Sequence, residues 1–138
     1  MIYLDTSAVV KLLRRETETD ALVKHLDAHP DHNLLTSALT TVEATRALTA
    51  IGAADVAARA IRRSDHIEIG DSTIPAVSVT ATVLDLARTV PPAVLRSLDA
   101  IHLATALLAG DDLHHLITYD KRMIAAAEAV GLRTSTPS

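Results

Sequence analysis

Cysteine, tryptophan and phenylalanine are absent from this 138-residue sequence, and tyrosine occurs only at Tyr3 and Tyr119. Without cysteine the chain cannot form disulfides, bind zinc through thiolates or use a thiol nucleophile, and it suits a reducing compartment. Any metal ion must therefore be held by oxygen or imidazole. The shortage of aromatic rings also removes the stacking platform on which RRM and OB-fold domains bind bases.

Long apolar runs are also missing. No stretch of about twenty uncharged apolar residues could span a bilayer, and the first residues lack the basic region and apolar core of a signal peptide. With 49% hydrophobic residues, a chain of 138 residues can bury one sizeable core and is too short to suggest two. We expect a single domain over residues 1–138, located in the cytoplasm and without a membrane partner.

Positive charge is scarce, because the formal net charge is -4, whereas affinity for phosphates normally depends on lysine and arginine. If four of the 17 acids bind cations, however, the other 13 balance the 13 lysines and arginines. Basic residues also follow acids closely, with Lys11 after Asp5 and Lys121 directly after Asp120. A nucleic-acid partner therefore remains open, with solvated helix faces as the alternative explanation of these basic residues.

Strand and helix signals alternate along the chain. Short apolar runs predict strands at Ile2–Leu4, Leu34–Thr36, Ile67–Ile69, Leu116–Thr118 and about Leu132–Thr134. Caps and helical periodicity predict helices from Thr6 or Ser7 to about Arg15, from Thr17–Asp20 onward, from Ser37–Thr41 to before Gly52, at Ala53–Ser64, from Ile74 (with Pro75 at its start) to about Val90, at Ser97–Ala109 and at Lys121–Ala129. This alternation predicts an α/β fold with a parallel sheet.

Four acids occupy comparable places in this arrangement. Asp5 ends the first strand, Asp120 follows the fourth, and Glu43 and Asp99 lie in the first turns of helices. Because the ends of parallel strands and the starts of the following helices share one sheet edge, all four acids can converge there. Two carboxylates about 4 Å apart repel by roughly 4 kcal/mol at an effective dielectric of about 20, so we expect Mg²⁺ or Mn²⁺ among them. Such a site predicts hydrolysis of phosphodiester bonds.

Each acid alone also has a structural explanation. Asp5 and Asp120 could cap the helices that follow them, and Asp99 could interact favourably with the dipole of its own helix. Glu43 could pair with Arg46 three residues later. Capping does not require four acids to share one edge, and their convergence therefore favours a functional site.

Three stretches carry a family resemblance: Ile2–Leu12, the stretch from Thr36–Ala38 through Val42–Glu43 to Arg46–Leu48, and the stretch from Leu98–Ala106 to Leu116–Asp120. Together they resemble the PIN-domain ribonucleases and, within them, the VapC-type toxins of bacterial toxin–antitoxin pairs. The resemblance spans nearly the whole chain in the right order. The segment from about Ala53 to Val90 matches only in its coarse helical character.

The resemblance implies a three-layer α/β/α sandwich with a central parallel sheet and a Mg²⁺- or Mn²⁺-dependent endoribonuclease activity. It also implies an RNA substrate, a cognate VapB-like antitoxin that blocks the site, and a homodimer. Asp5, Glu43 and Asp99 match the three strongest acidic positions of the family, and Asp120 matches a more variable fourth.

The resemblance also assigns supporting roles. Thr6 and Ser7 match hydroxyls that orient a ligand or a water, and Thr118 matches a hydroxyl near the acids. Lys11, Arg46 and Lys121 are the basic residues near these acids, and we expect them to steer the substrate, with a solvated face as the alternative. We expect His102 to support a ligand or pack its helix, and the remaining candidates for zinc ligands to lie on the surface: His25, His29, His32, His114 and His115.

Other functions fit less well. Haloacid-dehalogenase-like phosphatases need a second acid two residues after the first, where this chain has Ser7, and receiver domains need an acid pair, which Asp5-Thr6 does not provide. A non-catalytic PIN-like scaffold that binds RNA or a protein is the more serious alternative. The full set of four acids weighs against it.

Overall fold

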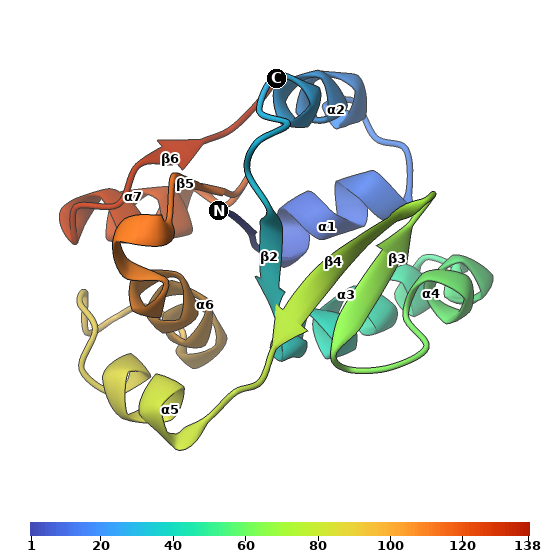
Figure 1. The fold of residues 1–138 in the computed structure, drawn as a ribbon. Coiled ribbons are helices and arrows are strands. Elements are labelled where there is room, and N and C mark those ends of the chain that lie inside the picture. Colours follow the sequence, from blue (N-terminus) through green and yellow to red (C-terminus); the bar gives the residue numbers. More distant parts are fainter.

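The short apolar runs form a central six-stranded sheet in the computed structural model, which describes residues 1–138. The strands follow one another across the sheet in the order β3-β4-β2-β1-β5-β6. Their bounds are β1 (Ile2–Leu4), β2 (Leu34–Ser37), β3 (His66–Ile69), β4 (Ser72–Val77), β5 (His115–Ile117) and β6 (Thr134–Ser135). Figure 1 shows helices on both sides of this sheet.

Helices account for most of the remaining chain. They are α1 (Thr6–Leu13), α2 (Thr19–Asp27), α3 (Ala38–Ala50), α4 (Ala54–Ala60), α5 (Ala81–Ala87), α6 (Ser97–Leu108) and α7 (Lys121–Ala129), with a short 3₁₀ turn at Gly110–Asp112. Four of them begin at a side-chain oxygen that accepts a first-turn N–H, from Asp5, Ser37, Thr80 and Asp120. None is both long and apolar enough to cross a bilayer.

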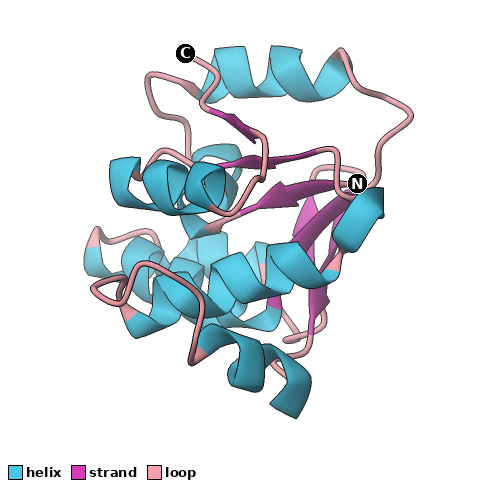
Figure 2. Cartoon of the chain, turned by 90° about the vertical axis from the view of Figure 1, so that its left-hand side faces the viewer, coloured by secondary structure: helices cyan, strands magenta, loops and turns pink.

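The central strand β1 explains the three layers, because successive side chains of a strand point to opposite faces. Ile2 and Leu4 pack into a buried cluster with residues of α1 and α2, whereas Tyr3 packs on the other face with Leu103 of α6 and Met123 of α7. Both faces of the sheet are therefore covered, and Figure 2 shows the strands running between the helices. This is the α/β/α sandwich that the resemblance implies.

The parallel pairs define two edges of the sheet. β1 pairs in parallel with β2 and with β5. These three strands therefore end together, and we call this the carboxyl edge, marked by Leu4, Ser37 and Ile117; α1, α3 and α7 start at or just beyond it. The opposite amino edge is marked by Ile2 and Leu34, and by the start of β5.

The predicted helix from Ile74 to Val90 is wrong in its first half. Ser72–Val77 is strand β4, and only Ala81–Ala87 of this segment is regular α-helix. We expected a parallel sheet, but β4 runs antiparallel to β3, so the sheet is mixed. The remaining strand pairs are parallel.

A tight turn explains this hairpin. Gly70 and Asp71 alone connect β3 to β4, and Gly70 has a φ of +57°, as the first position of a type II′ turn requires. Pro75 does not break β4, because the parallel pairing of β4 with β2 begins one residue later, at Ala76. Elsewhere the predicted bounds shift by a few residues: the fourth helix ends at Ala60, and the last strand is Thr134–Ser135.

Candidate active site

Asp5 lies directly after β1 and is the N-cap of α1. Its Oδ1 accepts hydrogen bonds from the Ala8 backbone N–H at 3.1 Å and from the Ser7 hydroxyl at 2.5 Å, and its Oδ2 accepts one from the Thr118 hydroxyl. Burial raises the pKa of Asp5, and these three hydrogen bonds lower it in part. The capping role and a place in the site therefore coincide in one carboxylate.

Two hydroxyls connect the end of β1 to the end of β5. The Ser7 hydroxyl accepts a hydrogen bond from the Tyr119 backbone N–H at 3.0 Å, and the Thr118 hydroxyl accepts one from the Asp120 backbone N–H at 3.1 Å. Asp120 in turn caps α7 through its Oδ1. Ser7 and Thr118 thereby fix the positions of Asp5 and Asp120 relative to each other.

Glu43 reaches the same edge from α3. Its Oε1 accepts a hydrogen bond from the Thr6 hydroxyl at 2.7 Å and lies 2.6 Å from Nε2 of His102, whereas its Oε2 has no hydrogen-bond partner in the protein. Burial alone would raise the pKa of Glu43, but the hydrogen bonds from His102 and Thr6 hold it below its usual value. Glu43 is therefore ionised at neutral pH and keeps one oxygen free.

His102 connects Glu43 to the core. Its Nδ1 lies 2.7 Å from the hydroxyl of Tyr3, whose pKa is raised well above its usual value by burial, so that the hydroxyl keeps its proton. An Nε2–H that donates to Glu43 leaves Nδ1 to accept from Tyr3. Both ring nitrogens are then engaged, which agrees with the supporting role expected for His102. The buried Tyr3 partner has no sequence signal that we can identify.

Arg96, which the sequence analysis did not single out, joins the other two acids. Its Nε lies 3.0 Å from Oδ2 of Asp99, and its Nη2 lies 3.3 Å from Oδ2 of Asp120. Asp99 makes the largest contribution to a raised Arg96 pKa, and Asp120 and Glu43 raise it further. The spacing of three residues to Asp99 is the only sequence signal that could have indicated this contact.

The structure thus brings together the four predicted acids, which we call the acidic cluster: Asp5, Glu43, Asp99 and Asp120. The donors are carboxylate oxygens, which suit a hard ion such as Mg²⁺ or Mn²⁺, and the adjacent His102 has no free nitrogen. As the side chains stand, no three acids are arranged to hold an ion, and Arg96 pairs with two of them. The donor chemistry of the acidic cluster fits Mg²⁺ or Mn²⁺.

The basic residues expected to steer substrate differ from one another. Lys11 is buried, and its Nζ pairs with Glu16 at 2.7 Å and Glu18 at 2.9 Å. It joins α1 to the start of α2, which contradicts a role in steering. Arg46 and Lys121 are exposed and form no ion pair, so the alternative pairing of Arg46 with Glu43 does not occur.

Five histidines expected on the surface lie together in one place, and four of them are partly exposed. They are His25, His29, His32, His114 and His115. His115 is buried, and it begins β5, so the group lies at the amino edge. It belongs to a different part of the molecule from the acidic cluster.

The chain is similar to known proteins over nearly its whole length. The chain is 44% identical to Ribonuclease VapC35 of Mycobacterium tuberculosis (strain CDC 1551 / Oshkosh), over 99% of this chain and 97% of that protein. It is 45% identical to Ribonuclease VapC46 of M. tuberculosis (strain ATCC 25618 / H37Rv), over 99% of this chain and 98% of that protein. A chain of a toxin–antitoxin complex from Klebsiella pneumoniae shares the fold, with a TM-score of 0.67 and 19% identity over 100% of this chain and 98% of that one.

The PIN domain model matches residues 2–129, a range that contains five of the six strands, all seven helices and the whole acidic cluster. Together with relatives above 40% identity over nearly the full length, this match settles the family. The chain belongs to the PIN-domain family.

Proposed function

We propose that this protein is a Mg²⁺- or Mn²⁺-dependent endoribonuclease and the toxin of a toxin–antitoxin pair. The observation that carries the proposal is the acidic cluster at the carboxyl edge of a PIN fold. The relatives of this chain that are named as ribonucleases support RNA as the substrate. The absence of cysteine suits a reducing compartment, and we place the protein in the cytoplasm.

Some residues of the site would hold the metal ion, and others orient those residues. Asp5, Asp99, Asp120 and the free Oε2 of Glu43 would hold the ion, which when bound supplies Lewis-acid activation of water and neutralises charge on the phosphoryl group. Thr118 and Ser7 hold Asp5 in a fixed orientation. His102 and Thr6 fix Glu43 and keep it ionised, so that it can bind a cation or orient a water.

Substrate contacts are expected to run through phosphates and not through stacked bases, because the chain has no tryptophan or phenylalanine. Arg46 is exposed on α3, the helix that carries Glu43. Lys121 is exposed at the start of α7, directly after Asp120. Arg96, once released from its two aspartates, adds a third positive charge at the acidic cluster. We assign these three residues to phosphate contacts.

The partners follow from the same assignment. A cognate antitoxin of the VapB type would cover the carboxyl edge and block access to the acidic cluster, and the solved toxin–antitoxin complex with this fold supports such a partner. We also propose a homodimer, as in the family. A non-catalytic scaffold is the alternative, and the complete set of acids, with Glu43 held ionised, argues against it.

Cleavage of RNA by the purified protein tests the proposal. Native protein should cut end-labelled tRNA, rRNA or mRNA with Mg²⁺ or Mn²⁺ and should stop in EDTA. Asp5→Asn keeps the shape of the cap and removes the charge, and Glu43→Gln keeps the contacts with His102 and Thr6, so each should lose about 100-fold or more in rate. Asp55→Asn is the matched control, because Asp55 is an exposed acid on α4.

Two results would decide against the nuclease. One is that native protein cuts none of the three RNA pools with either metal, while Asp5→Asn binds RNA as well as native protein does. The other is cutting that persists unchanged in Asp5→Asn and Glu43→Gln. Circular dichroism of each variant must match that of native protein for the comparison to count.

A further inference from the structure

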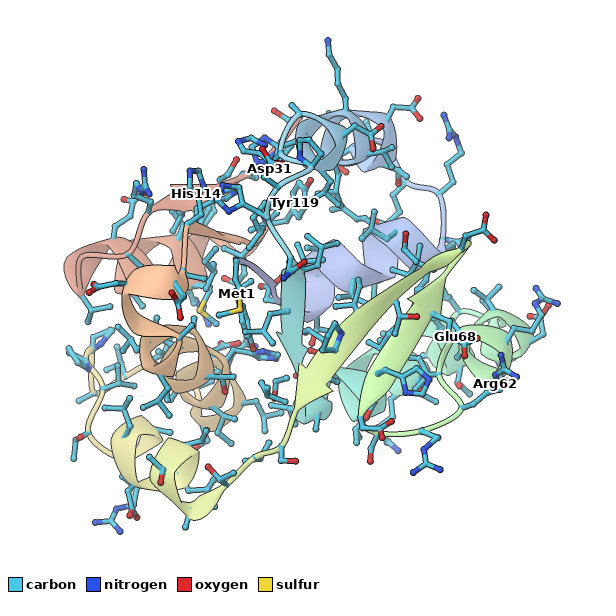
Figure 3. The ribbon with its side chains drawn as sticks, viewed as in Figure 1. Met1, Asp31, Arg62, Glu68, His114 and Tyr119 are labelled. Carbon is cyan, nitrogen blue, oxygen red and sulfur yellow. The ribbon has the colours of Figure 1, made fainter.

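The five histidines at the amino edge form one continuous group, which we call the histidine cluster. His25 lies in the last turn of α2, His29 and His32 lie in the loop that leads to β2, and His114 and His115 lie at the start of β5. Figure 3 shows His114 beside the loop that carries Asp31, and the rings of His32 and His114 are 4.3 Å apart. None of the five rings forms an ion pair with an acid.

Three of these rings are spaced as ligands of one ion would be. The ring centres of His25, His29 and His115 are 4.6, 5.0 and 5.4 Å apart. In a tetrahedral site with metal–nitrogen distances of about 2.1 Å, two imidazole ring centres lie about 5 Å from each other. Stacked surface rings do not require this nearly equilateral triangle.

Two of the donor atoms already face each other. Nε2 of His25 lies 2.8 Å from Nε2 of His115, and two nitrogens bound to one tetrahedral ion are about 3.3 Å apart. As they stand, the rings are not arranged to hold an ion, and one proton is shared in the hydrogen bond between these two nitrogens. Replacing that proton by a metal ion requires the two atoms to separate by only about 0.5 Å.

The neighbouring hydrogen bonds place the protons of His29 and His115 on Nδ1. Nδ1 of His29 lies 2.7 Å from the backbone carbonyl of His25, so it carries the proton and Nε2 of His29 keeps its lone pair. Nδ1 of His115 lies 2.6 Å from Nδ1 of His114, which can accept a hydrogen bond from it; His115 then carries its proton on Nδ1 and keeps the lone pair of Nε2. Hydrogen bonds of this kind orient metal-binding histidines in proteins.

Two of the three rings lie where burial favours the neutral form that ligands need. Burial, followed by the neighbouring histidines, lowers the pKa of His115 to about 4, and burial followed by His29 lowers the pKa of His25. Both rings are therefore neutral at pH 7, and metal ions bind neutral imidazole. Imidazole nitrogen favours zinc, nickel and copper, whereas the oxygen donors of the acidic cluster favour magnesium and manganese.

We propose that His25, His29 and His115 bind one borderline divalent transition-metal ion, with Zn²⁺ as the reference ligand, at the amino edge of the sheet. The site is separate from the acidic cluster, because His115 precedes Thr118 by three residues, or about 10 Å along an extended chain. Its ion joins the end of α2 to the start of β5 and stabilises the fold by binding the native state.

Zinc titration of the full chain tests this site. The protein is stripped with EDTA, dialysed and titrated calorimetrically with Zn²⁺ in excess Mg²⁺, beside the variants His25→Gln/His29→Gln, His66→Gln and Asp99→Asn. Native protein, His66→Gln and Asp99→Asn should bind a single equivalent with micromolar or tighter affinity. The double variant should bind at least about tenfold more weakly. His66 is the matched control, since it lies on β3 beside Asp65, outside the cluster.

Two further measurements separate the site from its alternatives. Co²⁺ should give the intense visible bands of a tetrahedral site in native protein and not in the double variant, and Zn²⁺ should raise the unfolding temperature of native protein but not that of the double variant. Equal zinc affinity in the double variant, loss of binding in Asp99→Asn, or no binding by native protein at micromolar zinc would each overturn the proposal. None of these readouts depends on ribonuclease activity, so the two proposals stand or fall separately.

Discussion

Arg96 supplies a positive charge where the acidic cluster would otherwise repel itself. The guanidinium bonds to Asp99 and Asp120 at once, yet its side chain is 64% exposed. Ion pairs of such exposed side chains contribute about 0.2–1 kcal/mol, because water and salt screen them. Arg96 therefore holds the two aspartates in place without binding them tightly, and we expect the proposed divalent ion to displace it.

Removing this guanidinium should strengthen metal binding. In Arg96→Gln we expect the affinity for Mn²⁺ in the absence of RNA to rise about two- to fivefold, the range that an ion pair of up to about 1 kcal/mol allows. Electron paramagnetic resonance of free Mn²⁺ during a titration measures this affinity. Arg122→Gln is the control, because Arg122 lies next to Lys121 on α7, is exposed and forms no ion pair. An unchanged or weaker affinity in Arg96→Gln contradicts the competition.

His102 should matter to catalysis although it touches neither metal nor substrate. A glutamine at this position moves the N–H group that donates to Glu43 away from its present place. It also leaves the buried hydroxyl of Tyr3 without its partner. Residues that orient a metal ligand typically contribute about 10–100-fold to activity or metal affinity. We expect His102→Gln to weaken Mn²⁺ binding by a factor in that range and to destabilise the fold by about 1–3 kcal/mol. Urea unfolding and the Mn²⁺ titration together check this, and unchanged metal affinity would leave His102 with a packing role only.

At the scale of elements, the β3–β4 hairpin depends on one glycine. Nothing lies within 4 Å of the position that a Cβ on Gly70 would take, so Gly70→Ala has no clash and tests the backbone alone. A positive φ disfavours an L-residue, and we expect a loss of about 1 kcal/mol in the free energy of unfolding by urea. Asp71→Ala in the same turn is the control, because Asp71 has a negative φ and should change stability by less than about 0.5 kcal/mol. Equal losses in both variants would contradict the turn assignment.

This hairpin also shows where reasoning from the sequence failed. Pro75 suggested the first turn of a helix. In the structure it lies in β4, one residue before β4 begins to pair with β2. The decisive signal was Gly70-Asp71 between two apolar runs, which is typical of a two-residue hairpin. The elements around the acids were easier to predict, because Asp5, Ser37 and Asp120 cap the helices that follow and mark the ends of strands.

The candidate site likewise has one part that the sequence predicts and another that it does not. Strand ends and the starts of the helices that follow them share an edge whatever the details of packing, and this rule places Asp5, Glu43 and Asp120 together. Asp99 lies on α6, which follows α5 and not a strand, so its place depends on tertiary packing. The partners of these acids depend on tertiary packing: Tyr3 meets His102 across 99 residues of sequence. The histidine cluster is a similar case, since no local pattern indicates that His25 contacts His115, 90 residues away.

At the scale of the whole molecule, the two edges of one sheet carry groups of opposite chemistry. The carboxyl edge gathers four acids around Arg96, and the amino edge gathers five imidazole rings without an acidic partner. A fall in pH therefore adds uncompensated positive charge to the amino edge. Zinc, where bound, would compete with the protons for the same nitrogens.

The metal-free protein should accordingly lose stability in weak acid. The pKa of His115 is about 4 in the folded chain and about 6.5 in an unfolded one. Between these values the unfolded state binds more protons, so stability rises with pH. The contribution of His115 is complete above about pH 6.5 and is lost as the pH falls toward about 4, with a size on the order of 2 kcal/mol.

Urea unfolding in EDTA between about pH 7 and about pH 4.5 measures this dependence. Carboxylates titrate near the lower end of the same range, so the informative quantity is the difference in slope between native protein and His115→Gln. The variant removes a buried ring and starts from a lower stability, yet its stability should fall less steeply with acid than that of native protein. Parallel slopes would mean that His115 is protonated as readily in the folded chain as in the unfolded one, and the ring would then lie in water and not, as the structure has it, among its neighbours at the amino edge.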